Sequence, residues 1–407
     1  MKILKNKYFI ATVVPIIFFI LLSFLPSSFW KITYEFAISA IVNKEPVATT
    51  TEPVVFHLKT PEPLKGIYMS ACVAGTPSFR QKLVDLIKET ELNAVVIDVK
   101  DFTGTLSYEP TNPELKGAWE NTRCGAKDMA DFIKQLHNDN IYVIARVTVF
   151  QDPYYTKLHP ELAVQSKTTG TPWKDKKGLN FLDVGGKKTW DYIVSIAKDA
   201  YGIGFDEINF DYIRFPSDGN MKDATYMMSS LTKAEQLEKF YKYLGDEMKQ
   251  AGIPTSADLF GMTTTNTDDL GIGQLLETAL ANFDYVAPMV YPSHYPPGFN
   301  NWKDPNTKTY ELIKFVMDSG VKRAEATTTL VKTLFNERIG TSTPAIYTHA
   351  AVDKLKLRPW IQDFSYGGEY GPVEVRNQIK ATYDTGLTSW VLWAPSNKYT
   401  REALLAN

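Results

Sequence analysis

The chain has 407 residues, of which 44% are hydrophobic and 22% are charged, the balance of an ordinary globular protein. Its formal net charge of −2, with no clustered Lys/Arg face, gives no reason to expect a nucleic-acid partner. Once a membrane-proximal region is set aside, the remaining length suits one large α/β barrel or two modest domains.

Residues 8–25 form an uncharged apolar run of the length that spans a bilayer. Lys2, Lys5 and Lys7 precede this run, so the positive-inside rule places the N-terminus in the cytoplasm and the rest of the chain outside. A secretory signal would have a shorter apolar segment and a small-residue cleavage site, for which 37–39 is a weak candidate. We therefore expect residues 1–30 to be an uncleaved signal-anchor in the cell membrane, with a secreted protein as the alternative.

Residues 31–64 are expected to connect this membrane helix to a folded domain. Positions 43–64 are rich in Pro and Thr and lack helical periodicity, which indicates an extended tether. We expect a single extracytoplasmic domain over 65–407.

From residue 65 onward, strand-like and amphipathic helix-like segments alternate, the pattern of a parallel sheet wrapped by helices. Eight strands with intervening helices predict an α/β fold of the (β/α)8 TIM-barrel type. The expected strands are 65–71, 94–100, 141–149, 205–213, 254–260, 284–291, 357–364 and 389–394. The segment 321–356 is expected to add a helical insertion before the seventh strand. Long connections at 150–187, 216–230 and 292–306 follow strands, where such barrels build their active sites.

Cys72 and Cys124 are the two cysteines of the chain. Each follows an expected strand closely enough to lie near the same end of the barrel, so the two could form a disulfide in an oxidising compartment. The alternative is two unpaired thiols. Neither spacing resembles a metal or redox motif.

The segment 204–216, GFDEINFDYIRFP, is the most informative part of the chain. Read as a strand, it sends Ile208 and Phe210 to one side and Glu207, Asn209 and Asp211 to the other. A strand with a polar second face fits a barrel that ends at a catalytic mouth.

Other expected strands repeat this polar face. The residues on such faces are Asp98 and Lys100, with Asp101 just beyond them, Arg146, and Asp258. Charged side chains are rarely buried unless paired, so we expect this set to face one shared polar space. The alternative is an ion-pair network that supports the barrel without catalysing a reaction.

Enzymes that cleave glycosidic bonds commonly use two carboxyl groups beside an aromatic-lined cleft. Asp211 suits the ionised role, because Lys100, Arg146 or Arg214 nearby would lower its pKa. Asp258 is our candidate for the proton donor, with Glu207 and Asp363 as competitors. The full set of expected substrate-binding residues is Asp98, Lys100, Asp101, Arg146, Glu207, Arg214, Tyr291, His294, Trp360, Asp363 and Trp393, in which Tyr291, Trp360 and Trp393 would stack on sugars.

Several common catalytic motifs are absent from the sequence: the G-x-S-x-G elbow, the Walker phosphate loop and the G-x-G-x-x-G fingerprint. The five His residues are scattered and include no H-x-x-x-H pair, so we expect no zinc site and no cofactor. An ion held by the oxygens of Asp98, Asp101 and Asp211 stays open as an alternative.

Three runs, 152–184, 189–219 and 357–367, resemble a bacterial family of glycoside hydrolase domains first catalogued as a domain of unknown function. The resemblance covers about 65–400 and rests on FDEI-x-FDYIRFP and RPW-x-QDF. It implies a TIM-barrel glycosidase fold, and it implies membrane anchoring because members of the family are often anchored.

A more distant similarity connects the fourth strand with the D-G-x-D-x-D-x-E motif of family 18 chitinases. Asp206 and Asp211 match its first and last Asp, but Asn209 replaces the middle one and Ile213 stands where the catalytic Glu would be. This departure argues against the acetamide-assisted chitinase mechanism. Asp211, Asp258 and Asp363 also occupy positions like those of the amylase carboxylates, although the fifth-strand acid there is Glu.

The sequence therefore predicts a membrane-anchored, extracytoplasmic glycoside hydrolase that cleaves a polysaccharide or oligosaccharide by two-carboxylate acid/base catalysis. One alternative is a non-catalytic envelope glycan-binding protein on a degenerate barrel. Another is a metal-dependent hydrolase or deacetylase.

Overall fold

The computed structural model describes residues 55–227, 230–330 and 346–407, and Val55–Asn407 form one compact unit. The expected membrane helix at 8–25 and most of the expected linker lie outside the described residues. Within the described ranges, none of the helices has the length and apolar character needed to cross a bilayer.

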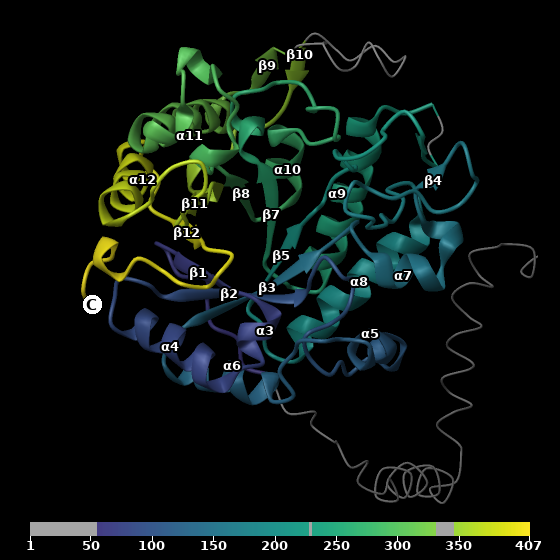
Figure 1. Cartoon of the computed structure of the whole chain (residues 1–407), viewed down its shortest axis with the longest axis horizontal. Coiled ribbons are helices and arrows are strands. Elements are labelled where there is room, and N and C mark those ends of the chain that lie inside the picture. The colour runs from purple at the N-terminus through teal and green to yellow at the C-terminus, as the bar shows by residue number, and fades with distance from the viewer. Residues whose placement is uncertain (1–54, 228–229, 331–345) are drawn as a thin grey trace, which may run out of the picture. The chain divides into compact units, whose positions relative to one another are not determined.

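A closed barrel of eight parallel strands forms the centre of the fold (Figure 1). Strands that follow one another along the chain are neighbours in the barrel, which confirms the predicted (β/α)8 topology. All eight expected strands are present: β1 (Lys65–Met69), β2 (Ala94–Lys100), β3 (Tyr142–Thr148), β5 (Glu207–Asp211), β7 (Thr255–Phe260), β8 (Tyr285–Met289), β11 (Trp360–Gln362) and β12 (Trp390–Trp393).

Helices surround this barrel (Figure 1). They are α3 (Ala71–Ala74), α4 (Pro77–Lys88), α5 (Lys116–Glu120), α6 (Met129–Asn138), α7 (Pro153–Leu158), α8 (Lys187–Gly202), α9 (Lys233–Gln250), α10 (Leu276–Asn282), α11 (Thr309–Glu325) and α12 (Pro372–Asp384). In α9, a capping box between Thr232 and Glu235 satisfies the first backbone N–H groups. Its buried face includes Leu237, Leu244 and Met248, at the spacing of one helical stripe.

The core is divided by the barrel wall into two clusters. Outward strand side chains such as Ile97, Ile208 and Leu259 pack with the helices in the larger cluster. Inward side chains, including Tyr68 and Trp360, form a smaller cluster inside the barrel. This division follows from the two-residue period of strands, which separates inward from outward positions.

The segment 321–356 differs from the expected helical insertion. Helix α11 ends at Glu325, and β9 (Thr328–Leu330) then pairs antiparallel with β10 (Ile346–Thr348). This part is rich in Thr, which favours strands over helices. Residues 331–345 lie outside the described part.

The long connections after β3 and β5 are joined to each other. Within them, β4 (Gln165–Ser166) pairs antiparallel with β6 (Ala224–Thr225). The Asp223 carboxylate reinforces this pairing by accepting a hydrogen bond of 2.6 Å from the Ser166 hydroxyl. The two connections are therefore ordered against each other.

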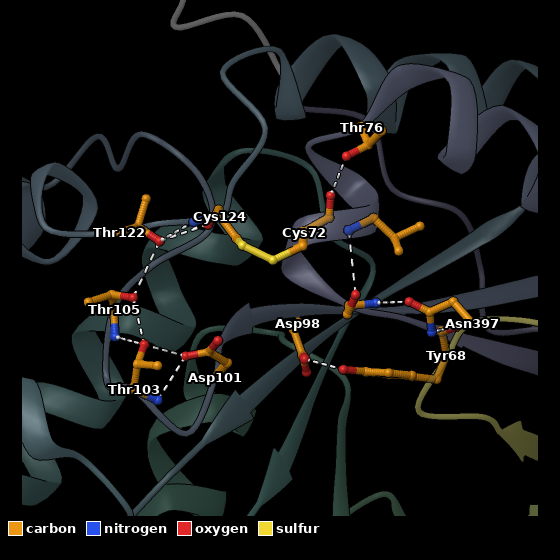
Figure 2. Close-up of a disulfide and its surroundings, with 12 residues drawn as sticks. Tyr68, Cys72, Thr76, Asp98, Asp101, Thr103, Thr105, Thr122, Cys124 and Asn397 are labelled. Atoms are coloured by element: carbon orange, nitrogen blue, oxygen red, sulfur yellow. Dashed lines mark hydrogen bonds between the residues drawn. A yellow bond between two sulfur atoms is a disulfide. The ribbon is translucent and has the colours of Figure 1, made fainter.

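Cys72 and Cys124 form a disulfide that joins α3 to the connection after α5 (Figure 2). The bond encloses 52 residues of sequence, with the two Cα atoms 4.5 Å apart. The sequence allowed either a disulfide or two unpaired thiols, and the structure contains the disulfide.

The residues just before β1 pack against the N-terminal ends of the strands. Asp206 accepts hydrogen bonds from the backbone N–H of Leu58 at 2.7 Å and of Val143 at 2.8 Å. The Thr60 and Tyr142 hydroxyls are 2.9 Å apart. Asp206 therefore joins the segment before β1 to β3 at the N-terminal end of the barrel. This residue is the one that matches the first Asp of the chitinase motif.

Candidate active site

Strand register gathers polar side chains inside the barrel. Neighbouring strands pair one residue with the next around the barrel: Asp98 of β2 with Arg146 of β3, Arg146 with Asn209 of β5, and Asn209 with Ser256 of β7. Because paired residues of parallel strands share a level and a face, these four side chains form one inward layer. Asp211 and Asp258 lie two residues further on, toward the mouth of the barrel.

Arg146 is the centre of this arrangement. It is 7% exposed, and its two terminal nitrogens donate hydrogen bonds to Asp98, at 2.5 Å, and to Asp211. Its Nε lies 3.8 Å from Oδ2 of Asp258. Such charge-assisted contacts fix both the position and the orientation of a carboxylate. One guanidinium thus binds two carboxylates directly and lies close to a third carboxyl group, with the three groups on three strands.

Asp98 is the deepest of these three groups. Tyr68 of β1 donates a hydrogen bond from its hydroxyl to Oδ2 of Asp98 (Figure 2). Burial raises the pKa of Asp98, while the charge of Arg146 opposes that shift. Asp98 does not line the mouth cavity described below, so its main contact with the site is through Arg146.

Asp258 is held in a form suited to carrying a proton. Burial, reinforced by the charge of Asp211, holds its pKa well above the usual range of a carboxyl group. Its Oδ1 accepts hydrogen bonds from Asn209 Nδ2 at 2.8 Å and Trp360 Nε1 at 2.7 Å. Since both donors bind Oδ1, the proton belongs on Oδ2.

Asp211, at the end of β5, makes the contacts of a carboxylate. Besides the Arg146 guanidinium, it accepts a hydrogen bond of 2.5 Å from the backbone N–H of Tyr212. Tyr212 has a φ of 49°, in the left-handed region that bulky residues rarely adopt. Backbone strain of this kind concentrates at functional sites, and here it directs an N–H to Asp211.

A cavity of about 360 Å³ opens at the strand C-termini above these groups. Its lining is aromatic and apolar apart from a few polar groups, the usual character of a ligand site. The lining residues are Arg146, Asp211, Tyr212, Arg214, Asp258, Phe260, Gly261, Met262, Met289, Tyr291, His294, Tyr295, Trp360 and Trp393. A larger cavity of about 540 Å³ lies near the N-terminal ends of β7 and β8, lined by Thr255 and Asp284 among others. We place the site in the smaller cavity because it contains the carboxyl groups.

The three expected stacking residues differ in what they offer. Trp393 is only half-buried, and its ring packs 4.1 Å from that of Tyr68 and 5.2 Å from the Arg146 guanidinium. Trp360 is buried, with its indole N–H committed to Asp258. Tyr291 is also buried and stacks on Trp393 with ring centroids 6.5 Å apart. Trp393 is therefore the ring available to a sugar.

Lys100 was expected in the shared polar space and lies elsewhere. A β-bulge between Asp98 and Lys100 shifts the register, so Lys100 pairs with Val147 rather than sharing the inward face of Asp98. Its ammonium group forms a fully buried ion pair with Asp152 at 2.9 Å.

Three further expected residues lie outside the cavity lining. Glu207, deep in the barrel, pairs with Arg358 at 2.9 Å. Asp363 accepts hydrogen bonds from the backbone N–H of Thr400 at 2.9 Å and its hydroxyl at 2.6 Å. Asp101 accepts bonds from Thr103 within a turn. Arg146, Arg214, Tyr291, His294, Trp360 and Trp393 do line the cavity with Asp211 and Asp258.

Some residues of the site were not assigned to it from the sequence. The alternation placed Asn209 on the polar face of its strand, but without a role. Tyr68 shares the same inward parity and could have been found in this way. Phe260 ends β7 with the same parity as Asp258. Tyr212 and Tyr295 lie in connections after strands, where side-chain direction does not follow the two-residue period. Among the described residues, no group of three or more His, Cys, Asp or Glu side chains is arranged to hold a metal ion.

The closed parallel barrel, with paired carboxyl groups at the carboxyl ends of its strands, defines the class as the TIM-barrel glycoside hydrolases. Residues 66–399 match the family described as "Putative glycosyl hydrolase domain", and the chain belongs to this family.

Several solved structures are similar to this chain. The PgaB (BpsB) glycoside hydrolase domain from Bordetella bronchiseptica matches with a TM-score of 0.52 at 13% identity, over 84% of this chain and 98% of that one. A hypothetical protein from Ruminiclostridium thermocellum is 37% identical over 47% of this chain and 96% of its own, with a TM-score of 0.43. The Bacillus megaterium spore cortex-lytic enzyme SleL is 10% identical over 84% of this chain and 74% of its own, with a TM-score of 0.46. No curated protein matches the sequence.

Proposed function

We propose that the protein cleaves the glycosidic bonds of a polysaccharide with Asp211 and Asp258 as its two working carboxyl groups. The observation that carries this proposal is their difference in environment at one cavity. Asp211 is bound by a guanidinium and a backbone N–H, whereas Asp258 is buried with a raised pKa. Paired titratable groups in environments this different divide acid and base roles between them.

In the proposed reaction, Oδ2 of Asp258 gives its proton to the glycosidic oxygen as the bond to the anomeric carbon breaks. The Asp211 carboxylate stabilises the positive charge that develops on the sugar ring. Water then bonds to the anomeric carbon through its oxygen and gives up one proton to a carboxylate of the pair, which completes the hydrolysis. Arg146 holds Asp211 in place, and the half-buried Trp393 in the cavity lining supports a sugar ring. Asn209 and Trp360 keep Oδ1 of Asp258 occupied, so that Oδ2 is the atom left for the substrate.

The proposal is tested by incubating the full chain with a panel of purified polysaccharides and measuring new reducing ends. We expect Asp211→Asn to lower turnover by about 10²–10⁴-fold, because it removes the charge opposite the developing cation. Asp363→Asn is the matched control, since Asp363 also follows a barrel strand but bonds Thr400 outside the cavity. Binding of glycans with no hydrolysis across the panel would instead identify a non-catalytic glycan-binding protein.

We also propose that residues 1–30 anchor the protein in the cell membrane and that 31–64 link this anchor to the domain, with 55–64 packed on the barrel as part of the compact unit. The 65–407 domain then acts outside the cytoplasm. The apolar run at 8–25 and the Lys residues before it support the anchor. The Cys72–Cys124 disulfide supports the location, since disulfides persist in oxidising compartments. Protease treatment of intact cells would test this arrangement, because a domain outside the membrane is digested while a cytoplasmic one is protected.

A further inference from the structure

Arg214 is a buried cation in the wall of the cavity that contains Asp211 and Asp258. The residue is 9% exposed. Nη1 donates hydrogen bonds to the Phe215 carbonyl and the Ser217 hydroxyl, both at 3.1 Å. These two bonds fix one end of the guanidinium to its own loop.

The other end of Arg214 has no protein partner. Within residues 55–227, 230–330 and 346–407, Nε and Nη2 make no hydrogen bond, and no carboxylate forms an ion pair with the group. Asp211 and Asp218 act on it only from beyond ion-pair distance. Burial lowers the pKa of Arg214, which reflects the cost of keeping this charge out of water.

Other buried arginines of the domain show the contrast. Arg146 is paired with Asp98 and Asp211, Arg358 with Glu207, and Arg323 with both oxygens of Glu277 at 2.8 and 2.6 Å. Buried charges in proteins are normally paired in this way. Arg358 also has Nε and Nη2 without a hydrogen bond, but its Nη1 is ion-paired. Among the described residues, Arg214 is the buried arginine with no carboxylate partner, and it lines the cavity.

The orientation of Arg214 defines which ligand group fits. Its guanidinium carbon lies 4.6 Å from the centre of the Phe260 ring and 5.0 Å from that of Tyr212, so two aromatic faces hold its plane. Nε and Nη2 carry two parallel N–H bonds along one edge. This edge matches the two oxygens of a carboxylate in the bidentate geometry that arginine favours.

Arg214 is also the cation in the described cavity lining that is left for a ligand. Arg146 is already occupied by carboxylates of the protein. Burial lowers the pKa of His294, which keeps its ring neutral near pH 7.

We propose that Arg214 binds a carboxylate of the substrate, so that the polysaccharide is acidic and carries uronic acid or another carboxyl-bearing sugar beside Asp211. This inference rests on the proposed function for the place of the cavity in catalysis. The binding step itself does not depend on hydrolysis, so the two can be tested apart.

Calorimetric titration of the full-length Asp258→Asn variant measures binding without turnover. The probes are oligosaccharides of galacturonate, alginate and hyaluronan, each beside its carboxyl-reduced counterpart, together with sulfated galactan oligosaccharides. We expect at least one carboxylated probe to bind about 10- to 100-fold more tightly than its reduced form. Adding Arg214→Gln should remove this preference, whereas Arg214→Lys should keep part of it.

Two controls separate recognition from folding. Arg123→Gln removes the same charge from an exposed residue and should leave the preference unchanged. Arg214→Gln should not lower the thermal unfolding midpoint, because no ion pair of the described protein is lost and a buried charge is removed.

Equal binding of carboxylated and reduced probes, no binding of any carboxylated probe, or a preference that survives Arg214→Gln would overturn the inference. An Arg214-dependent preference for sulfated over carboxylated probes would overturn the assignment to carboxyl groups. Hydrolysis of neutral glycans without any effect of Arg214 would refute this inference and leave the proposed function standing. Arg214-dependent binding with no hydrolysis of any glycan would refute the proposed function and leave this inference standing.

Discussion

At the scale of single residues, the site depends on the different contacts that the Arg146 guanidinium makes with Asp211 and Asp258. Arg146 donates a terminal N–H to Asp211, but only its Nε approaches Asp258, at 3.8 Å. Asp258 therefore receives less compensation for its burial than Asp211 does. This asymmetry is consistent with the raised pKa of Asp258.

The raised pKa of Asp258 predicts the alkaline limb of the pH–activity profile. A general acid works only while protonated, so activity should be present at low pH and fall as pH rises through the pKa of Asp258 in the folded protein. Because that pKa is raised, the fall should come well above the usual carboxyl range of about 4. Initial rates of polysaccharide cleavage across pH 3–10 would measure it. A fall near pH 4 would contradict the assignment.

Trp360→Phe should shift the alkaline limb of the pH–activity profile to higher pH. The indole N–H bonds Asp258 at 2.7 Å and favours its charged form, so removing it should raise the pKa further and shift the alkaline limb to higher pH. Trp390→Phe is the matched control, because the Trp390 N–H bonds the Tyr383 hydroxyl at 3.0 Å, away from the cavity lining. A shift toward lower pH in Trp360→Phe, or equal shifts in both variants, would refute this role.

At the scale of elements, alternation along the strands was the most reliable signal in the sequence. It located all eight barrel strands and the shared interior of Asp98, Arg146, Asp211 and Asp258, because each strand has one face toward the helices and one toward the barrel axis. The signal failed at Lys100, where a bulge breaks the period. A bulge depends on pairing with another strand, so one strand's own sequence does not reveal it.

Other features of the site also depend on contacts that are distant in the chain. The hydrogen bond from Trp360 to Asp258 joins residues 102 positions apart, and that from Arg358 to Glu207 spans 151. Residue types at these positions indicate what is possible, but only closure of the barrel selects the partner. The Thr-rich part of 321–356 was misread as helical for a related reason, since its strand pairing forms between two separate segments.

Removing one partner of the buried pair of Lys100 and Asp152 should strongly destabilise the fold. Lys100→Met leaves the Asp152 carboxylate buried without its partner, so we expect a loss of about 3–5 kcal/mol in the free energy of unfolding. Adding Asp152→Asn removes the second charge while keeping an oxygen for the N-cap of α7, and should restore much of that loss. Denaturant unfolding of the three proteins would measure this. A double variant less stable than Lys100→Met would contradict the pairing argument.

The disulfide should stabilise the fold without acting in the site. Closing a loop of 52 residues corresponds to about 4 kcal/mol of unfolding free energy in the chain-entropy description. The Cys72→Ala/Cys124→Ala double variant should therefore unfold at lower denaturant concentration. Its activity under native conditions should persist, because neither Cys lines the cavity. An unchanged unfolding midpoint would show that the bond contributes little.

At the scale of the whole described domain, the two ends of the barrel have different tasks. The N-terminal ends of the strands receive residues 55–64 through Asp206 and Tyr142. The C-terminal ends carry the carboxyl groups, the cavity and the long connections joined by β4 and β6. Stability and chemistry are separated in this way in TIM barrels generally. Changes at the first end should alter stability before they alter turnover.

The central claim is that Asp211 and Asp258 act together in one reaction. Its most direct test is the turnover number for polysaccharide cleavage by the full chain, Asp211→Asn, Asp258→Asn and the double variant, all checked for folding by circular dichroism. We predict that each single variant loses about 10²–10⁴-fold and that the double variant is little worse than the poorer single one, because groups that act as a unit are not additive. Turnover by either single variant at the rate of the unchanged protein would contradict the claim.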